Sequence, residues 1–180
     1  EVMRDLKSAN NNVAGYSTDA AFLPNENGSL QNETAALNVM IEFFGKNVGR
    51  VRDQSSYLYR ITNHAQKNGS RTMETMASTD PLVILMFLPV ANVSKLSRAL
   101  FALMEKHSLC SEFEWVAINS KETSDPLAAI EAAKQRVLNN DAKKAVLVFS
   151  GLQCSLAATI PTCDIVVLAN NTMKYDLIFQ

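Results

Sequence analysis

The sequence predicts a parallel-sheet α/β domain of three layers over about residues 80–180, preceded by a mainly helical and irregular N-terminal segment. Two observations favour this class. Several short runs rich in Val, Ile and Leu show no alternation with polar residues, which is typical of strands buried on both faces. Stretches with apolar residues at helical spacing lie between these runs. Strands that alternate with helices in this way form right-handed crossovers and a parallel sheet.

The N-terminal segment, residues 1–78, begins with a polar stretch. Residues 1–32 are rich in Asn and in turn-forming residues, which indicates a loop with one short helical turn at 2–7. A helix is expected over 33–45, because apolar residues recur there every three or four positions. Asn32 precedes that pattern and can serve as its N-cap.

A basic stretch follows at residues 46–71. It holds six Lys or Arg residues and one Asp, so its net charge is 6 − 1 = +5. Tyr57 and Tyr59 lie within it, and cationic side chains beside aromatic rings can hold a phosphate backbone and stack a base. The alternative is a solvated helix face whose Tyr rings pack on the core.

The first strands and helices of the predicted sheet follow in order. Residues 82–88 form an unbroken apolar run that Pro89 ends, which predicts a central strand. Asn92 is a suitable N-cap for the helix predicted next. A short strand is expected at 115–118. A second helix should begin at 124–126, where polar residues precede a proline in the order typical of a helix start.

The last third of the chain contains two further buried strands, at 145–149 and 165–169. Small polar residues follow each of them, Ser150 and Gly151 after the first and residues 170–172 after the second. Ligands of open parallel sheets bind beyond the carboxyl ends of the strands. The sequence therefore predicts a functional site at these polar strand ends.

Composition limits the possible functions. The chain is 47% hydrophobic with a net charge of −1, which indicates a globular protein and argues against a strongly basic protein that coats nucleic acid. Its three cysteines form no CxxC pair and are expected to be free, buried thiols in a reducing compartment. No apolar run is long enough to span a bilayer and no signal peptide is evident, so no membrane contact and an intracellular location are expected.

The residues needed for nucleotide hydrolysis are not evident. Gly45 and Lys46 have the dipeptide of a phosphate-binding Walker A loop, but Met40 and Asn47 stand where that loop needs a glycine and a hydroxyl. No DExx-type acidic pair follows a strand to hold Mg²⁺. We therefore predict no catalytic residue and no metal site in this chain alone, and the existence of an enzymatic activity stays open.

The strand predicted at 145–149 with Ser150 and Gly151 after it, the Leu-Ala-Ala-Thr-Ile-Pro step at 156–161, and the Cys-Asp pair that leads into the last strand occur in a characteristic order. This order resembles the last motifs of superfamily 2 helicases, and it is most similar to those of large DNA viruses. The resemblance covers roughly residues 80–180. Phe-Leu-Pro at 87–89, with the helix predicted after it, resembles the motif that opens the second helicase domain, whose loop contacts the nucleic-acid backbone. It implies that residues 79–180 form the second of two RecA-like domains. Because the chain starts at Glu1 and stops inside a predicted helix at Gln180, we expect a truncated domain from a longer protein.

The resemblance implies that the parent protein is an ATP-dependent helicase acting on single-stranded RNA or DNA. ATP and Mg²⁺ would bind between this domain and a missing first RecA-like domain. Ala157 stands where the family usually has glycine, and the arginines of the final motif lie beyond the chain. The implied contacts to the nucleic-acid backbone are Pro89, Asn92, Ser150, Gly151 and Ser155, and the implied residues of the ATP cleft are Thr159 and Gln180.

Two other classes of function remain open. A Rossmann-like enzyme for a small molecule, such as a methyltransferase or a reductase, would use the same sheet, although the chain lacks a GxGxxG turn after its first strand. A non-catalytic binding or assembly module would use the basic stretch and the strand ends for a protein partner. On the helicase interpretation, replacement of Ser150 or Gly151 should weaken nucleic-acid binding and change folding little.

Overall fold

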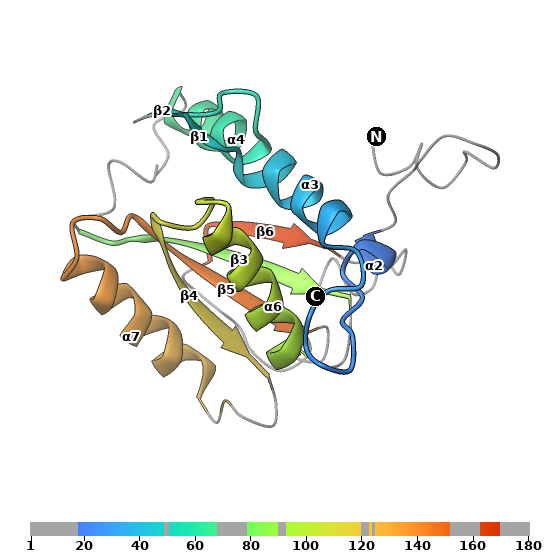
Figure 1. The fold of residues 1–180 in the computed structure, drawn as a ribbon. Helices are drawn as coiled ribbons and strands as arrows, with labels where there is room; N and C mark the ends of the chain where they lie inside the picture. The colour runs from blue at the N-terminus through green and yellow to red at the C-terminus, as the bar shows by residue number, and fades with distance from the viewer. Residues whose placement is uncertain are drawn as a thin grey trace.

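The computed structural model contains a four-stranded sheet in which every strand pair is parallel, and Figure 1 shows it with helices on both sides. This confirms the predicted parallel α/β fold class, an arrangement that RecA-like and Rossmann-like domains share. The structure describes residues 18–48, 51–67, 79–89, 93–119, 123, 125–151 and 163–169. The strands, in their order across the sheet, are β4 (Phe113–Ile118), β5 (Ala145–Gly151), β3 (Leu82–Leu88) and β6 (Ile165–Leu168).

The strand boundaries agree with the predicted runs to within two residues, since β4 begins at Phe113 and β6 ends at Leu168. Strand β3 covers the predicted run, and Pro89 follows its last residue. Strand β5 is two residues longer than predicted, because Ser150 and Gly151 continue its pairing with Phe87 and Leu88 of β3. The two residues expected just beyond the strand are therefore its last two residues.

Helices α6 (Val93–Lys106) and α7 (Pro126–Leu138) cover opposite faces of the sheet. The chain crosses from β3 over β5 to β4 through α6 and then returns by one strand through α7. Right-handed crossovers in opposite directions place their helices on opposite faces, as Figure 1 shows. The predicted start of α7 is confirmed, with Asp125 as N-cap accepting a hydrogen bond from the backbone N–H of Ala128 at 3.0 Å.

The described N-terminal part adds three helices and a two-stranded antiparallel hairpin. The predicted helix after Asn32 is confirmed, and the Asn32 side chain caps it by accepting from the N–H of Ala35 at 2.9 Å. The hairpin was not predicted, whereas the helix after it lies in the basic stretch 46–71, where a solvated helix face is one of the two interpretations left open. The helical turn expected at 2–7 lies outside the described residues. The elements are α2 (Thr18–Ala21), α3 (Glu33–Phe44), β1 (Asn47–Val48), β2 (Val51–Arg52) and α4 (Tyr57–Lys67).

One hydrophobic core joins this N-terminal part to the sheet. Phe44, at the end of α3, packs edge-on against Phe113, the first residue of β4, with ring centroids 5.3 Å apart. Leu58 of α4 belongs to the same buried cluster as the α6 side of the sheet. The α7 side has a separate, smaller core that includes Val146 and Ile130. Among the described helices, none has the length and apolar character needed to cross a membrane.

Candidate functional site

The parallel register brings the carboxyl ends of the strands to one edge of the sheet, called here the carboxyl edge and defined by Pro89, Asn119, Ser150, Gly151 and Ala169. Along this edge Leu88 lies beside Gly151 in the β3–β5 ladder. Two segments that are distant in the sequence, residues 87–89 and 150–151, therefore become direct neighbours. These are two of the segments that resemble helicase motifs for nucleic-acid contact.

The strand order makes the boundary between β3 and β5 a switch point. The chain leaves β3 toward the β4 side of the sheet, whereas it leaves β5 toward the β6 side. In open parallel sheets the crevice between two strands whose connections diverge in this way is the usual place for a ligand. The geometry therefore favours the ends of β3 and β5 as the site.

Ser150 and Gly151 are both buried at this position. The Ser150 side chain is 1% exposed, and its hydroxyl donates a hydrogen bond to the carbonyl oxygen of Gly151 at 3.3 Å. Gly151 lies against the first residue of α6, because a Cβ atom built on it would be 2.7 Å from Cγ2 of Val93. Pro89 is half-buried. Among these predicted site residues, Pro89 is thus the more accessible one, and the roles of Ser150 and Gly151 stay predictions.

The close approach at Gly151 corrects the expectation that its replacement would change folding little. Gly151→Ala should lower the free energy of unfolding by about 1–3 kcal/mol, because the added methyl group must displace either β5 or the start of α6. Denaturant unfolding followed by circular dichroism measures this change. Ser150→Ala is the matched control, since it removes one long hydrogen bond and should cost about 1 kcal/mol or less. Equal stability of Gly151→Ala and the wild type would contradict the packing argument.

A small polar network at the carboxyl edge was missed by the sequence analysis. The side-chain amide of Asn119, directly after β4, donates a hydrogen bond to the hydroxyl of Ser94 in the first turn of α6. The hydroxyl of Thr123 donates to the carbonyl oxygen of Ala117 at 3.3 Å and accepts from the N–H of Asn119 at 3.3 Å. The network connects the end of β4 to the start of α6. Its sequence signal is weak: Asn119 follows a predicted strand, but its partner is distant in the sequence.

The remaining predicted site residues cannot be placed at this edge. Asn92, Ser155, Thr159 and Gln180 lie outside the described residues. The described part of the site thus comprises the strand ends and the network around Asn119, and the predicted ATP cleft has no described residue.

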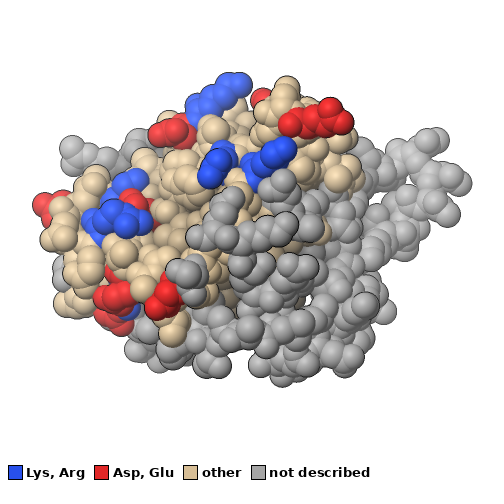
Figure 2. All heavy atoms as spheres, turned by 90° about the horizontal axis from the view of Figure 1, so that it is seen from below, with Lys and Arg blue, Asp and Glu red and all other residues tan. Residues whose placement is uncertain are grey.

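The charges of the described α/β part are largely paired. Figure 2 shows Lys and Arg interspersed with Asp and Glu over the face seen from below. Lys134, whose side chain is 9% exposed, pairs with Asp80 and lies 4.0 Å from Glu131. Arg136 pairs with Glu114. A protein surface of this kind attracts phosphates weakly, so a nucleic-acid contact at the carboxyl edge depends on hydrogen bonds more than on net charge.

The described cysteines and carboxylates do not form a reactive or metal-binding centre. Burial raises the pKa of the Cys110 thiol, and burial likewise raises that of Cys163, so both thiols are poor nucleophiles at neutral pH. Within the described ranges no three His, Cys, Asp or Glu side chains are grouped so that they could hold a metal ion.

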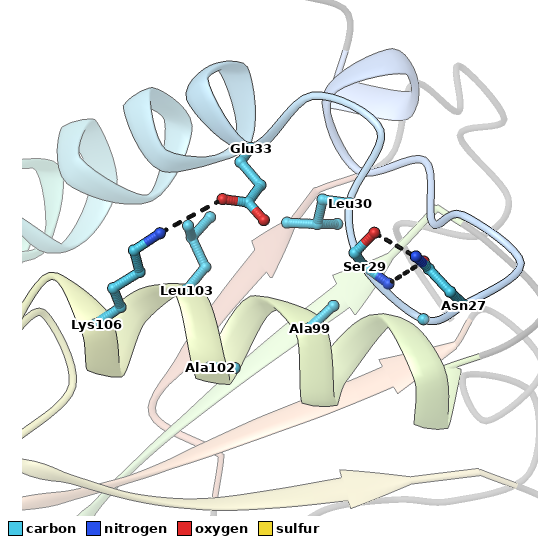
Figure 3. A pocket seen from close by; sticks show the side chains of 9 residues that line it. Asn27, Ser29, Leu30, Glu33, Ala99, Ala102, Leu103 and Lys106 are labelled. Atoms are coloured by element: carbon cyan, nitrogen blue, oxygen red, sulfur yellow. Dashed lines mark hydrogen bonds and ion pairs between the residues drawn. The ribbon is translucent and has the colours of Figure 1, made fainter.

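A surface hollow of about 300 Å³ lies on the outer side of α6, lined by the 27–30 loop, the start of α3 and the second half of α6 (Figure 3). Lys106 and Glu33 span it as an ion pair with 3.8 Å between their charged atoms. Asn27 accepts hydrogen bonds from the N–H and hydroxyl of Ser29. Because these polar groups already bond to one another, the hollow has weak means of holding a ligand.

Comparison with models of protein families, with curated proteins and with solved structures finds no significant match. The functional assignment therefore depends on the residues and their geometry.

Proposed function

We propose that this chain is part of an ATP-dependent superfamily 2 helicase, in which the carboxyl edge contacts the backbone of single-stranded nucleic acid. One observation carries the proposal. Two segments that resemble separate nucleic-acid-contacting motifs, residues 87–89 and 150–151, are neighbours in one parallel ladder at a switch point of the sheet. All carboxyl ends of a parallel sheet lie at one edge, so the support comes from the direct pairing of these two segments in the strand order.

The contact is chemically reasonable at the end of β5. The hydrogen bond from Ser150 to the carbonyl of Gly151 is long, 3.3 Å, and therefore weak. A phosphate oxygen would accept a shorter, charge-assisted bond from the same hydroxyl. Because Ser150 is buried, this exchange requires the end of the strand to open toward solvent when nucleic acid binds.

ATP and Mg²⁺ belong to the proposed parent protein. The sequence supplies neither a Walker A loop nor a DExx pair, and the described residues group no carboxylates that fit a Mg²⁺ ion. We therefore assign the nucleic-acid contact to this chain and assign no step of ATP hydrolysis to it. The missing first RecA-like domain would supply those groups. Closure of the two domains would change the contacts that they make with the single-stranded nucleic acid. An intracellular location is part of this proposal.

The test is binding of fluorescently labelled single-stranded DNA and RNA to the 180-residue chain, measured by anisotropy over a series of salt concentrations. We expect affinity that falls as salt rises, because phosphate contacts release counterions. Ser150→Ala should weaken binding about three- to tenfold, the effect of losing one hydrogen bond of about 1 kcal/mol.

The matched control is Ser97→Ala. Ser97 is also a fully buried serine whose hydroxyl donates to a backbone carbonyl, that of Ser94 at 3.2 Å, so its loss should leave affinity unchanged. Unchanged affinity of Ser150→Ala would remove Ser150 from the site, and absence of salt-dependent binding would exclude the helicase function. Thermal stabilisation by a methyl donor or by NAD would instead favour a Rossmann-like enzyme.

A further inference from the structure

The first turn of α4 presents a cation and an aromatic ring together. Tyr57 and Arg60 are three residues apart and so lie on one face of the helix. The guanidinium carbon of Arg60 lies 5.9 Å from the centroid of the Tyr57 ring, within the range of a cation–π contact. Ser56 fixes the start of the helix, because its hydroxyl accepts a hydrogen bond from the N–H of Tyr59 at 3.3 Å and donates one to Asp53.

The hairpin before α4 brings the backbone of a second basic residue, Lys46, close to the start of the same helix. The N–H of Asp53 donates to the carbonyl oxygen of Lys46 at 3.0 Å, which closes the hairpin. Gly45 packs so closely on Ser56 that a Cβ atom built on it would be 2.8 Å from that of Ser56. The backbone of Lys46 therefore lies next to the start of α4. We call Lys46, Tyr57 and Arg60 the basic–aromatic surface.

The two cations of this surface are not neutralised by described groups. Lys46 and Arg60 are exposed, and neither forms an ion pair with a described carboxylate. Asp53 is the one acidic residue of the 46–71 stretch. Its carboxylate accepts hydrogen bonds from the hydroxyl and the N–H of Ser55, which lower its pKa and fix it within its own turn. In contrast, the cations that pair with carboxylates elsewhere are Lys106, Lys134, Arg136 and Lys144.

The basic–aromatic surface is separate from the carboxyl edge. Helix α4 packs against α3, whose last residue, Phe44, contacts Phe113 at the beginning of β4. In Figure 1, α4 and the hairpin lie away from the arrowheads that mark the strand ends. A ligand on this surface would therefore occupy a second site.

We infer that the basic–aromatic surface binds the backbone of single-stranded nucleic acid, with phosphates at Lys46 and Arg60 and a base against Tyr57. A guanidinium pairs with phosphate through two parallel hydrogen bonds, and an aromatic ring stacks on any base, so the combination holds a strand without reading its sequence. The half-buried Tyr57 ring beside the two exposed cations is what favours nucleic acid over an acidic peptide. The identity of the partner rests on the proposed function, whereas the existence of the surface does not.

The test compares the wild-type chain with the double variant Lys46→Gln/Arg60→Gln, using labelled oligothymidylate and a salt series. We expect about a tenfold loss of affinity and a slope of log affinity against log salt that is shallower by about 1.4, the value for two lost contacts to a single strand. Tyr57→Leu should also weaken binding, whereas Tyr57→Phe should bind like the wild type, because the ring and not its hydroxyl stacks. Circular dichroism melting checks that these substitutions leave the fold intact.

The matched control is Arg98→Gln. Arg98 is an exposed arginine of α6 that forms no ion pair with a described carboxylate. It therefore tests whether any exposed arginine attracts the oligonucleotide to the same extent. The inference is overturned if the double variant binds like the wild type, or if Arg98→Gln weakens binding as much as Arg60→Gln. It is also overturned if polyglutamate competes as well as unlabelled oligothymidylate does.

The two proposed nucleic-acid contacts, at the basic–aromatic surface and at the carboxyl edge, can be rejected separately. Loss of affinity in the double variant together with unchanged affinity in Ser150→Ala would support the basic–aromatic surface and reject the contact at the carboxyl edge. The reverse result would reject the surface and leave the proposed function standing. No binding of the wild-type chain to either single-stranded DNA or single-stranded RNA would reject both.

Discussion

Phe44→Ala is expected to lower the free energy of unfolding by about 3–5 kcal/mol, the usual cost of replacing a buried phenylalanine. Phe44 is fully buried, and its ring connects α3 to Phe113 at the first position of β4. Urea unfolding measures the change. The fluorescence of Trp115, the single tryptophan, reports on the sheet, and far-ultraviolet circular dichroism reports on all helices.

Phe43→Ala is the matched control for this prediction. Phe43 is adjacent in sequence and contacts the Phe44 ring at 4.8 Å, but it is only half-buried, so its replacement should cost clearly less. The two probes should give one common transition in the wild type, because the described N-terminal elements and the sheet share a core. Separate transitions for the two probes, or equal costs at the two positions, would show that Phe44 does not join these parts.

Asp80→Ala is expected to destabilise the protein by about 2–3 kcal/mol. The side chain of Lys134 is 9% exposed and pairs with Asp80, just before β3, so the variant leaves a largely buried ammonium group without its main partner. Removing one member of a fully buried ion pair costs about 3–5 kcal/mol, and the 42% exposure of the Asp80 side chain reduces that value. Thermal and urea unfolding at neutral pH give the measured change.

Lys134→Met tests the same pair from the other side. A methionine of similar length removes the buried charge and keeps the packing of α7 on the sheet, so the cost should be within about 1 kcal/mol. Glu131→Ala should have a still smaller effect, because Glu131 is exposed and lies 4.0 Å from the ammonium group. If Lys134→Met were as costly as Asp80→Ala, the ion pair itself would be stabilising, and the argument from an unpaired buried charge would be wrong.

The elements that sequence predicted best are those with a strong local pattern. The unbroken run 82–88 specifies a buried strand by itself, and a polar residue followed by Pro126 specifies a helix start. The hairpin was missed because its strands are two residues long. Helix α4 is predicted only as one of two alternatives, because the basic and aromatic residues of its stretch suit a solvated helix face and a nucleic-acid contact equally well.

The candidate site was predictable only in part. The polar residues at 150–151 after the apolar run can be recognised in the sequence. That they lie beside residues 87–89 depends on the strand order, which local patterns do not contain. The burial of Ser150 and the close approach of Gly151 to Val93 are tertiary effects as well. The bond between Asn119 and Ser94 joins two elements through a contact that neither local sequence indicates.

The strand order also affects how the chain can fold. No two consecutive strands of the parallel sheet form a hairpin, and among the described strands β3 pairs with β5 and β6, which are synthesised well after it. Closing such long loops before any pairing is gained makes folding slow, on the order of milliseconds to seconds for sheets rich in non-local contacts. Until β5 arrives, the seven apolar residues of β3 have no partner on either side, so the nascent polypeptide is most prone to aggregate during this interval.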